Sequence, residues 1–250
     1  MNSGIGRQFV EKTQYRHMGP SDQQKGLPQP PLELRPPQGA RESIDLPKPA
    51  TSQLGAMSLK QAIETRRSLR QYADTPLSLE ELSYLLWCTQ GVREIMFGKA
   101  TFRTVPSAGA RHPFETMLLI NRVEGLEPGL YWFVASGHRL VRLDAEPRIA
   151  DRIVQAAFNQ YFVAKSAVTF IWIADAVRTT WRYGERGYRY MHLDAGHVCQ
   201  NLYLAAESIG AGCCAIGAFT DEAMNELLGL DGVDQFVVYM GVVGKREPTA

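Results

Sequence analysis

The stretch VTFIWIA, residues 168–174, is apolar at both odd and even positions. Alternate side chains of a strand point to opposite faces of a sheet, so this pattern predicts a strand that is covered on both faces. Upstream, the short apolar runs 114–120, 130–134 and 139–143 are separated by turns that contain glycine. They predict a meander of antiparallel strands that leads into 168–174.

Apolar residues with helical spacing occur both before and after these strands. Ser58 with Gln61 and Ser78 with Glu81 each form a capping-box pair, and each opens an apolar helical pattern. We expect the two resulting helices to lie antiparallel, the first running into the arginines that follow it and the second ending at Gly91. Three further helices (148–160, 190–209 and 220–228) and two further strands (214–219 and 235–244) are predicted downstream.

The order of these elements predicts an α+β fold, with helices packed on a mostly antiparallel sheet. Residues 190–209 are apolar nearly all round, which predicts a helix inside the protein or at a subunit contact.

Composition excludes several classes of protein. The chain has 250 residues, of which 45% are hydrophobic and 21% charged, with a net charge of +1. This balance is typical of a globular protein and argues against a nucleic-acid binder, which would be strongly basic. Its four cysteines have neither metal-site spacing nor the density of a disulfide scaffold, and no apolar run could span a bilayer. We therefore expect a cytoplasmic protein with reduced thiols, no metal site and no membrane partner.

The N-terminal stretch 1–57, here called the arm, contains eight of the fourteen prolines, all before residue 50. Such a segment cannot form a regular core of its own, so we expect it to be disordered or laid over another surface. The main domain is predicted to cover residues 58–250.

An arginine cluster, defined as Arg66, Arg67, Ser68 and Arg70, follows the first predicted helix. If the helix continues through it, Arg66 and Arg70 lie one turn apart with Ser68 beside them. Guanidinium groups so close together repel one another unless an anion lies between them, and a phosphate suits their planar donors. The alternative is a solvated basic face at a helix C-terminus, where positive charge is favourable.

Two other stretches could help to bind a flat, phosphorylated ligand. The PSAG loop, Pro106–Gly109, is built of small residues that would let a ligand approach the backbone. Lys245 and Arg246 follow the last predicted strand and add two cations. By contrast, the glycines of GAGCCA at 210–215 imitate a dinucleotide-binding fingerprint but follow a helix and precede a strand, which is the wrong context.

These pieces resemble the FMN-binding elements of the nitroreductase superfamily, and in particular its SagB-type branch, which includes dehydrogenases that form thiazoles and oxazoles in peptides. The resemblance runs in order through FVEKTQYR, RRSLRQY, LEELSYLLWCTQG, RTVPSAGARHPFE, PGLYWF and YGERGYRYMHLDAGHVCQNLYLAAE. It implies a nitroreductase-like fold and a homodimer of domain-swapped type, with the FMN site between subunits and the arm wrapped around the partner.

The resemblance also implies roles for individual residues. It assigns the FMN phosphate and ribityl end to two groups: Arg66, Arg67 and Ser68, and Lys245 and Arg246. It assigns the flavin ring to Arg70, which would favour the anionic reduced flavin, and to two short stretches. These are Pro106, Ser107, Ala108 and Gly109, which line the ring edge, and the turn Ile216, Gly217 and Ala218, which covers one ring face.

One position departs from the branch. Where its azoline dehydrogenases carry a Lys-Tyr pair as base and acid, this chain has Arg182-Tyr183. Arginine hardly deprotonates and is a poor general base, whereas Tyr183 could donate a proton or orient a substrate. A purely structural salt bridge and packed aromatic remain the alternative.

The resemblance predicts an FMN-dependent oxidoreductase that transfers hydride from NAD(P)H to an electron-poor small molecule such as a nitroaromatic or quinone. One alternative is a SagB-type dehydrogenase that oxidises a peptide azoline or another natural-product intermediate and needs no nicotinamide. A second is a non-catalytic flavin-binding protein.

Overall fold

A computed structural model describes residues 4–37, 40–48, 54–144 and 146–247. Its centre is a seven-stranded sheet in the order β1-β6-β5-β4-β7-β9-β8, and each neighbouring pair is antiparallel. The strands of this sheet are β1 Ser43–Asp45, β4 Phe114–Ile120, β5 Gly129–Val134, β6 Arg139–Arg142, β7 Val168–Asp175, β8 Ala211–Ile216 and β9 Gln235–Lys245. A separate hairpin pairs β2 Val92–Met96 with β3 Ala100–Arg103.

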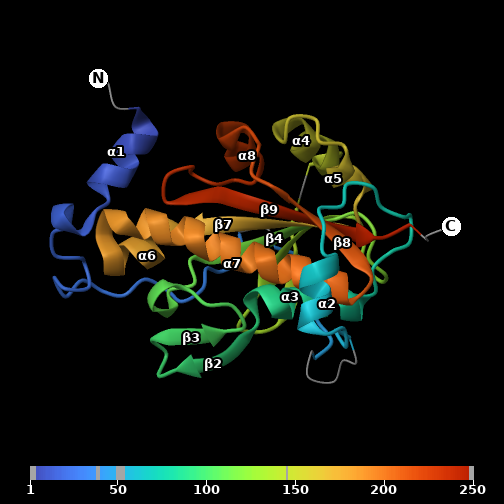
Figure 1. Ribbon diagram of the computed structural model, residues 1–250, viewed down its shortest axis with the longest axis horizontal. Coiled ribbons are helices and arrows are strands. Elements are labelled where there is room, and N and C mark those ends of the chain that lie inside the picture. The colour runs from blue at the N-terminus through green and yellow to red at the C-terminus, as the bar shows by residue number, and fades with distance from the viewer. Residues whose placement is uncertain (1–3, 38–39, 49–53, 145, 248–250) are drawn as a thin grey trace.

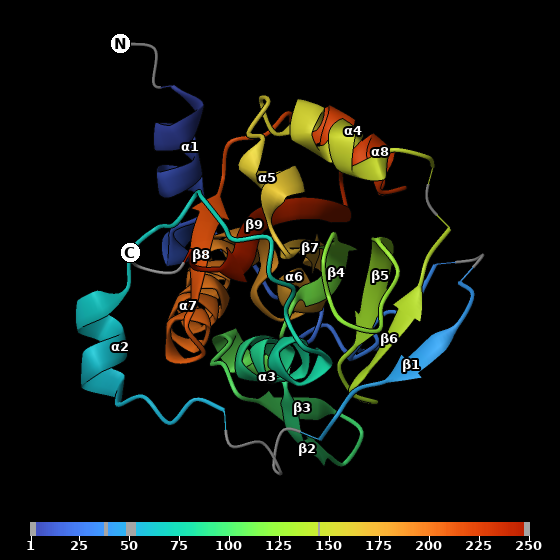
Figure 2. The ribbon, with the colours of Figure 1, turned by 90° about the vertical axis from the view of Figure 1, so that its right-hand side faces the viewer.

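Helices cover both faces of the sheet. The helices are α1 Ile5–Lys12, α2 Leu59–Thr65, α3 Leu79–Gln90, α4 Ile149–Ala156, α5 Phe162–Lys165, α6 Ala176–Tyr183, α7 Gly187–Ser208 and α8 Asp221–Leu227. Figure 2 shows α3 and α7 beneath the sheet and α4, α5 and α8 above it. No helix in the described part of the chain combines the length and the apolarity needed to cross a membrane.

Alternation along the central strands divides the core between these two layers. On β4, Leu118 faces the layer of α3 and α7, while its neighbours Met117 and Leu119 face the layer of α4 and α8. Every residue of β7 is buried, as its apolar pattern predicts. The predicted α+β fold with helices on an antiparallel sheet is confirmed.

The predicted course of the first helix is wrong at its C-terminal end. Ser58 caps α2 by accepting a hydrogen bond from the Gln61 N–H, but the helix stops at Thr65. The backbone turns extended at Arg66 (φ −56°, ψ 129°), because the segment that follows pairs with β8. In addition, α2 and α3 each pack against α7. Their positions are therefore set by α7 and not by the antiparallel contact with each other that the sequence predicted.

The region between β7 and β8 contains more helix than the sequence predicted. The short helix α6 precedes α7, which begins at Gly187 and closes before Gly210. Nor is α7 buried all round, because His192, His197 and Gln200 lie on an exposed face together with Leu193. The subunit contact proposed for this helix remains a prediction.

The described parts of the arm lie over their own chain. Strand β1 extends the sheet beside β6, and Figure 1 shows α1 next to the end of the molecule where α6 lies. Backbone groups of the arm between α1 and β1 form hydrogen bonds with Trp181. The Gln23 N–H donates to the Trp181 carbonyl at 2.8 Å, and the Trp181 side chain donates through Nε1 to the Leu27 carbonyl at 3.0 Å. Arg186 donates to the Thr13 carbonyl at 2.9 Å. The further expectation that the arm wraps a partner subunit remains a prediction.

A buried arginine connects the arm to the sheet. Arg178 on α6 is 1% exposed and forms ion pairs with Glu115 on β4 and with Asp175 at the end of β7. It also donates to the carbonyls of Leu32 in the arm, at 3.1 Å, and His112, at 2.9 Å. Burial alone would disfavour its charge, but the two carboxylates outweigh burial and hold the pKa of Arg178 above its ordinary value.

The substitution Glu115→Ala should lower the free energy of unfolding by about 3–5 kcal/mol, because it leaves Arg178 buried without its main counter-charge. Urea unfolding followed by circular dichroism measures this loss. The matched control is Glu146→Ala, which removes the surface ion pair to Arg152 and should cost no more than about 1 kcal/mol. Equal losses in the two variants would contradict the structural role given to Arg178.

Candidate functional site

The arginine cluster lies along the outer edge of β8. Ser68 forms a parallel bridge with Cys213, and the Leu69 N–H donates to the Cys213 carbonyl at 2.9 Å. Leu69 lies directly over Gly212, where an added Cβ would come within 2.3 Å of the Leu69 side chain. A glycine at that position is therefore what lets the segment 66–70 approach the strand.

The cations of this cluster have no acidic partner. Arg66 lies over the Tyr203 ring, 5.4 Å from its centre, and Ser68 Oγ is 2.9 Å from the Tyr203 hydroxyl. Arg67 and Arg70 are exposed. Among the described residues, none of these three arginines forms an ion pair. Three neighbouring positive charges without a counter-charge favour the binding of an anion.

Lys245 and Arg246 lie close by but are already paired. Arg246 forms an ion pair with Glu207, and the same carboxylate accepts a hydrogen bond from Thr65 Oγ1 at 2.6 Å. The chain ends of α2 and β9 therefore meet at Glu207, as the predicted convergence of the two cationic groups requires. Lys245 forms an ion pair with Glu81 of the α3 capping box, which gives this lysine a structural role that the sequence did not suggest.

A second set of candidate residues surrounds the PSAG loop. Asp194 of α7 is buried and accepts a hydrogen bond from Ser107 Oγ at 2.6 Å and others from the Ala108 N–H at 3.2 Å. Ser107 Oγ in turn accepts from the His112 N–H at 2.9 Å. Burial raises the pKa of Asp194 even though the bonds from Ser107 and Ala108 lower it. Asp194 thus fixes the loop to the long helix.

The backbone of this loop is unusually strained. Gly109, Ala110 and His112 have φ values of 58°, 53° and 44°, a region that residues with a side chain rarely adopt. Strained backbone that the surroundings maintain is frequent at functional sites. The His112 side chain is buried beside Arg103, and burial followed by that charge lowers its pKa to about 3, so the imidazole is neutral at physiological pH.

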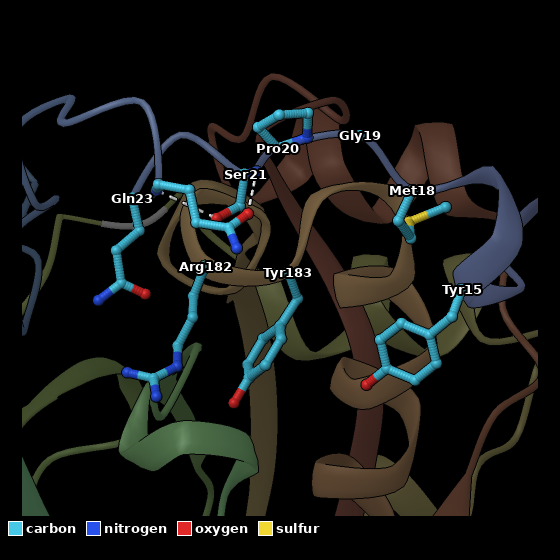
Figure 3. A pocket seen from close by; sticks show the side chains of 9 residues that line it. Tyr15, Met18, Gly19, Pro20, Ser21, Gln23, Arg182 and Tyr183 are labelled. Carbon is cyan, nitrogen blue, oxygen red and sulfur yellow. Dashed lines mark hydrogen bonds between the residues drawn. The ribbon is translucent and has the colours of Figure 1, made fainter.

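Arg182 and Tyr183 lie against the same loop. A Cβ added to Gly109 would come within 2.4 Å of the Tyr183 hydroxyl and 2.8 Å of Arg182 Nε. Figure 3 shows both side chains extending from α6 in the same direction, with the guanidinium and the phenol oxygen at their tips. The Tyr183 ring packs edge to face on Tyr190 at 4.9 Å.

Within one chain the candidate residues form two separate groups. The arginine cluster contacts α7 at Tyr203, nine residues after Asp194, so the cluster and the PSAG loop contact the helix about 14 Å apart. Figure 1 shows the corresponding ends of α7, beside α2 and beside α6. The turn Ile216–Ala218 follows β8, and Tyr203 ties this strand to the arginine cluster by accepting from the Ala215 N–H at 2.8 Å. The structure therefore groups 216–218 with the arginines and leaves the PSAG loop with Arg182 and Tyr183.

The residues that hold these groups in place were not predicted from the sequence. Asp194, Tyr203 and Glu207 all lie on α7, where each contacts one of the candidate loops. A carboxylate at a buried helical position needs a partner, and that was the available signal for Asp194 and Glu207.

Comparison with known proteins identifies the class of protein. A model of the Nitroreductase family matches residues 63–245. A putative nitroreductase of Methanocaldococcus jannaschii is 39% identical over 190 residues, which cover 76% of this chain and 92% of that protein. The chain therefore belongs to the nitroreductase family, which is a family of oxidoreductases.

Other relatives are more distant. The trifolitoxin-processing protein TfxB of Rhizobium leguminosarum bv. trifolii is 28% identical over 171 residues, 66% of this chain but only 46% of that protein. Among solved structures, a putative nitroreductase from Anabaena variabilis has a TM-score of 0.64 at 28% identity, over 76% of this chain and 38% of that one.

Two further structures share the fold at lower identity. A putative nitroreductase from Ralstonia eutropha has a TM-score of 0.68 at 23% identity, over 89% of this chain and all of that one. The Escherichia coli microcin synthetase McbBCD complex, with truncated pro-MccB17 bound, has a TM-score of 0.61 at 19% identity, over 80% and 77%.

The substitution Gly109→Ala should lower the free energy of unfolding by at least about 1–2 kcal/mol, because a left-handed φ is costly for alanine. The added methyl would also displace Tyr183 and Arg182. Gly137→Ala is the control, since Gly137 has no left-handed φ and its added Cβ would meet nothing nearer than 3.5 Å. Chemical denaturation of both variants measures the difference, and a Gly109 variant as stable as the control would refute the left-handed conformation assigned to Gly109.

Proposed function

We propose that this protein is an FMN-dependent oxidoreductase that works as a homodimer and transfers hydride from NAD(P)H to an electron-poor acceptor such as a nitroaromatic or a quinone. One observation carries the proposal: Arg66, Arg67 and Arg70 gather with Ser68 along β8 and have no acidic partner in the part of the chain that the structure describes. Membership of the nitroreductase family supports a flavin as the ligand of such a site.

The residues present fit FMN. A monophosphate offers several acceptor oxygens, which Arg66 and Arg67 can bind through paired N–H groups and Ser68 through its hydroxyl. Tyr203 orients Ser68 for this task. The Tyr203 hydroxyl accepts a hydrogen bond from the β8 backbone and can donate its own proton to Ser68 Oγ, which leaves the Ser68 proton free to bind the phosphate. Arg246 supports the same end of the site through Glu207 and Thr65.

The flavin ring would lie toward the other end of β8. Gly217 and Ala218 are exposed there and carry no bulky side chain, so a flat ring can approach their backbone. Arg70 lies on the outer edge of the same strand, where its charge would favour a ring that gains negative charge on reduction. When bound, FMN supplies the acceptor and donor of hydride.

The separation of the two groups of residues supports the homodimer. Arg66 and Ser68 contact α7 at Tyr203, about 14 Å along the helix from Asp194, which holds the PSAG loop, so the two groups do not meet within one chain. A partner subunit that packs on α2 and α7 would bring its own PSAG loop to the site. Leu59, Ile63 and Leu193 on these helices are 66%, 54% and 61% exposed, as expected for a surface that another subunit covers.

In this proposal Tyr183 donates a proton to the acceptor or orients it, and Arg182 contributes charge. Arg182 is exposed, and a guanidinium offers only donors, so it does not serve as a base. The contact of both side chains with Gly109 places them beside the loop that is proposed to line the ring.

Purified protein should be yellow and release FMN on denaturation. The substitution Arg66→Ala should raise the Kd for FMN about 10- to 100-fold, the loss expected for a charge-assisted hydrogen bond to phosphate. Fluorescence titration of apoprotein with FMN measures the Kd. Arg139→Ala is the control, since Arg139 is exposed on β6 near the opposite edge of the sheet. An unchanged Kd in the Arg66 variant would show that the phosphate binds elsewhere.

A second function is favoured by two of the relatives. TfxB is a toxin-processing protein, and the microcin synthetase complex holds a truncated precursor peptide. A SagB-type dehydrogenase acting on a peptide azoline or another natural-product intermediate would explain this likeness. The arginine at position 182 weighs against it, because the branch uses a lysine base there.

Anaerobic mixing with NADPH separates these functions. A nitroreductase-type enzyme should lose its yellow colour rapidly, followed at 450 nm in a stopped-flow spectrometer, and regain it on addition of p-benzoquinone. A SagB-type dehydrogenase or a non-catalytic flavin-binding protein should stay yellow. NADH is mixed in parallel, so that the absence of bleaching with both nicotinamides counts against the proposed function.

A further inference from the structure

A cavity of about 780 Å³ lies between the arm and α6. Its lining consists of Tyr15, Met18, Gly19, Pro20, Ser21, Gln23 and Gln24 from the arm and Arg182 and Tyr183 from α6. The arm side of this cavity is held in place on α6, because Gln23 and Leu27 are both hydrogen-bonded to Trp181. Among the described residues, Arg182 is the only charged group in this lining, and no carboxylate belongs to it.

A second positive charge lies behind the first. Arg111 is buried over the Trp181 ring, 5.5 Å from its centre, and donates hydrogen bonds to the carbonyls of Gly109 and Lys99. Burial lowers the pKa of Arg111, and the nearby charge of Arg182 lowers it further. Neither arginine forms an ion pair within the described parts of the chain, so this side of the cavity has an excess of positive charge.

The donors that face the cavity suit a small planar anion. Arg182 offers a fork of N–H groups that matches a carboxylate, and Tyr183 adds a hydroxyl. Gln23 and Gln24 add amides that can bind a neutral polar group of the same molecule. A single guanidinium with neutral donors fits a monoanion better than a phosphate dianion, for which the arginine cluster on β8 is the better site.

We propose that this cavity selects acceptors that carry a carboxylate, with Arg182 as the residue that determines specificity; this inference rests on the proposed function. The Arg182 guanidinium binds the carboxylate, and Arg111 strengthens the positive field from behind. Because Arg182 and Tyr183 contact Gly109, the remainder of the acceptor lies next to the PSAG loop, which the proposed function places at the flavin ring. The arm supplies the opposite wall and so limits the size of the acceptor.

Binding of a non-reducible carboxylate tests the cavity without any turnover. Isothermal titration calorimetry of the purified full-length protein with benzoate should show binding that Arg182→Gln weakens at least about tenfold, as expected for loss of a charge-assisted contact. Benzamide, the neutral isostere, should bind equally to both proteins. Arg139→Gln is the matched control and should bind benzoate like the unmodified protein. Benzoate binding that is absent, or that survives the Arg182 substitution unchanged, would overturn the proposal.

Turnover tests the same claim in the working enzyme. With NADPH as donor, kcat/KM for 4-nitrobenzoate should exceed that for 4-nitrobenzamide, and Arg182→Gln should abolish this preference mainly by raising KM for 4-nitrobenzoate. A variant that slows both nitro compounds equally would overturn the inference. If p-benzoquinone is reduced without any preference for the carboxylate, the inference fails while the proposed function stands. If no FMN is bound and no acceptor is reduced, the proposed function fails, and the benzoate titration alone decides whether the cavity binds carboxylates.

Discussion

The charge of Arg178, buried between two strands, a loop and the arm, is the constraint on which the arrangement of the site depends. Its guanidinium joins Glu115 in the centre of the sheet to Asp175 at the end of β7. It also donates hydrogen bonds to the carbonyl of Leu32 in the arm and to that of His112 before β4. A charge that is so far from water must satisfy nearly all of its donors. The positions of the arm, of α6 and of the strained loop are therefore set together rather than one by one.

Helix α7 sets the distance between the two groups of candidate residues. Asp194 holds the PSAG loop near one end, and Tyr203 and Glu207 hold the arginine cluster near the other. A rigid helix fixes the separation of these groups, so they stay apart within one chain. The same separation allows the surroundings of the arginine cluster and those of the PSAG loop to differ in charge and shape.

The sequence predicted those parts of the fold that local patterns determine. The strands around 168–174 and the caps at Ser58 and Ser78 follow from side-chain alternation and from hydrogen bonds within a few residues, and the structure has both. The end of α2 could not be predicted, because it depends on pairing with β8, which lies more than a hundred residues away in the sequence. Arg178 and Asp194 escaped notice for a similar reason. Glu115 and Leu32, which Arg178 contacts, and Ser107, which Asp194 contacts, are distant in sequence, and only the folded chain shows which polar groups are buried together.

The arm is attached to α6, and to Arg186 just after this helix, largely through backbone groups, such as the Gln23 N–H and the carbonyls of Thr13 and Leu27. Backbone groups are the same whatever side chains the arm carries, so its path can persist while its side chains change. The wall of the arm cavity can thus diverge among descendants of this protein without disturbing the sheet or the arginine cluster. Such a division would let evolution alter which molecules are admitted while the redox core stays the same.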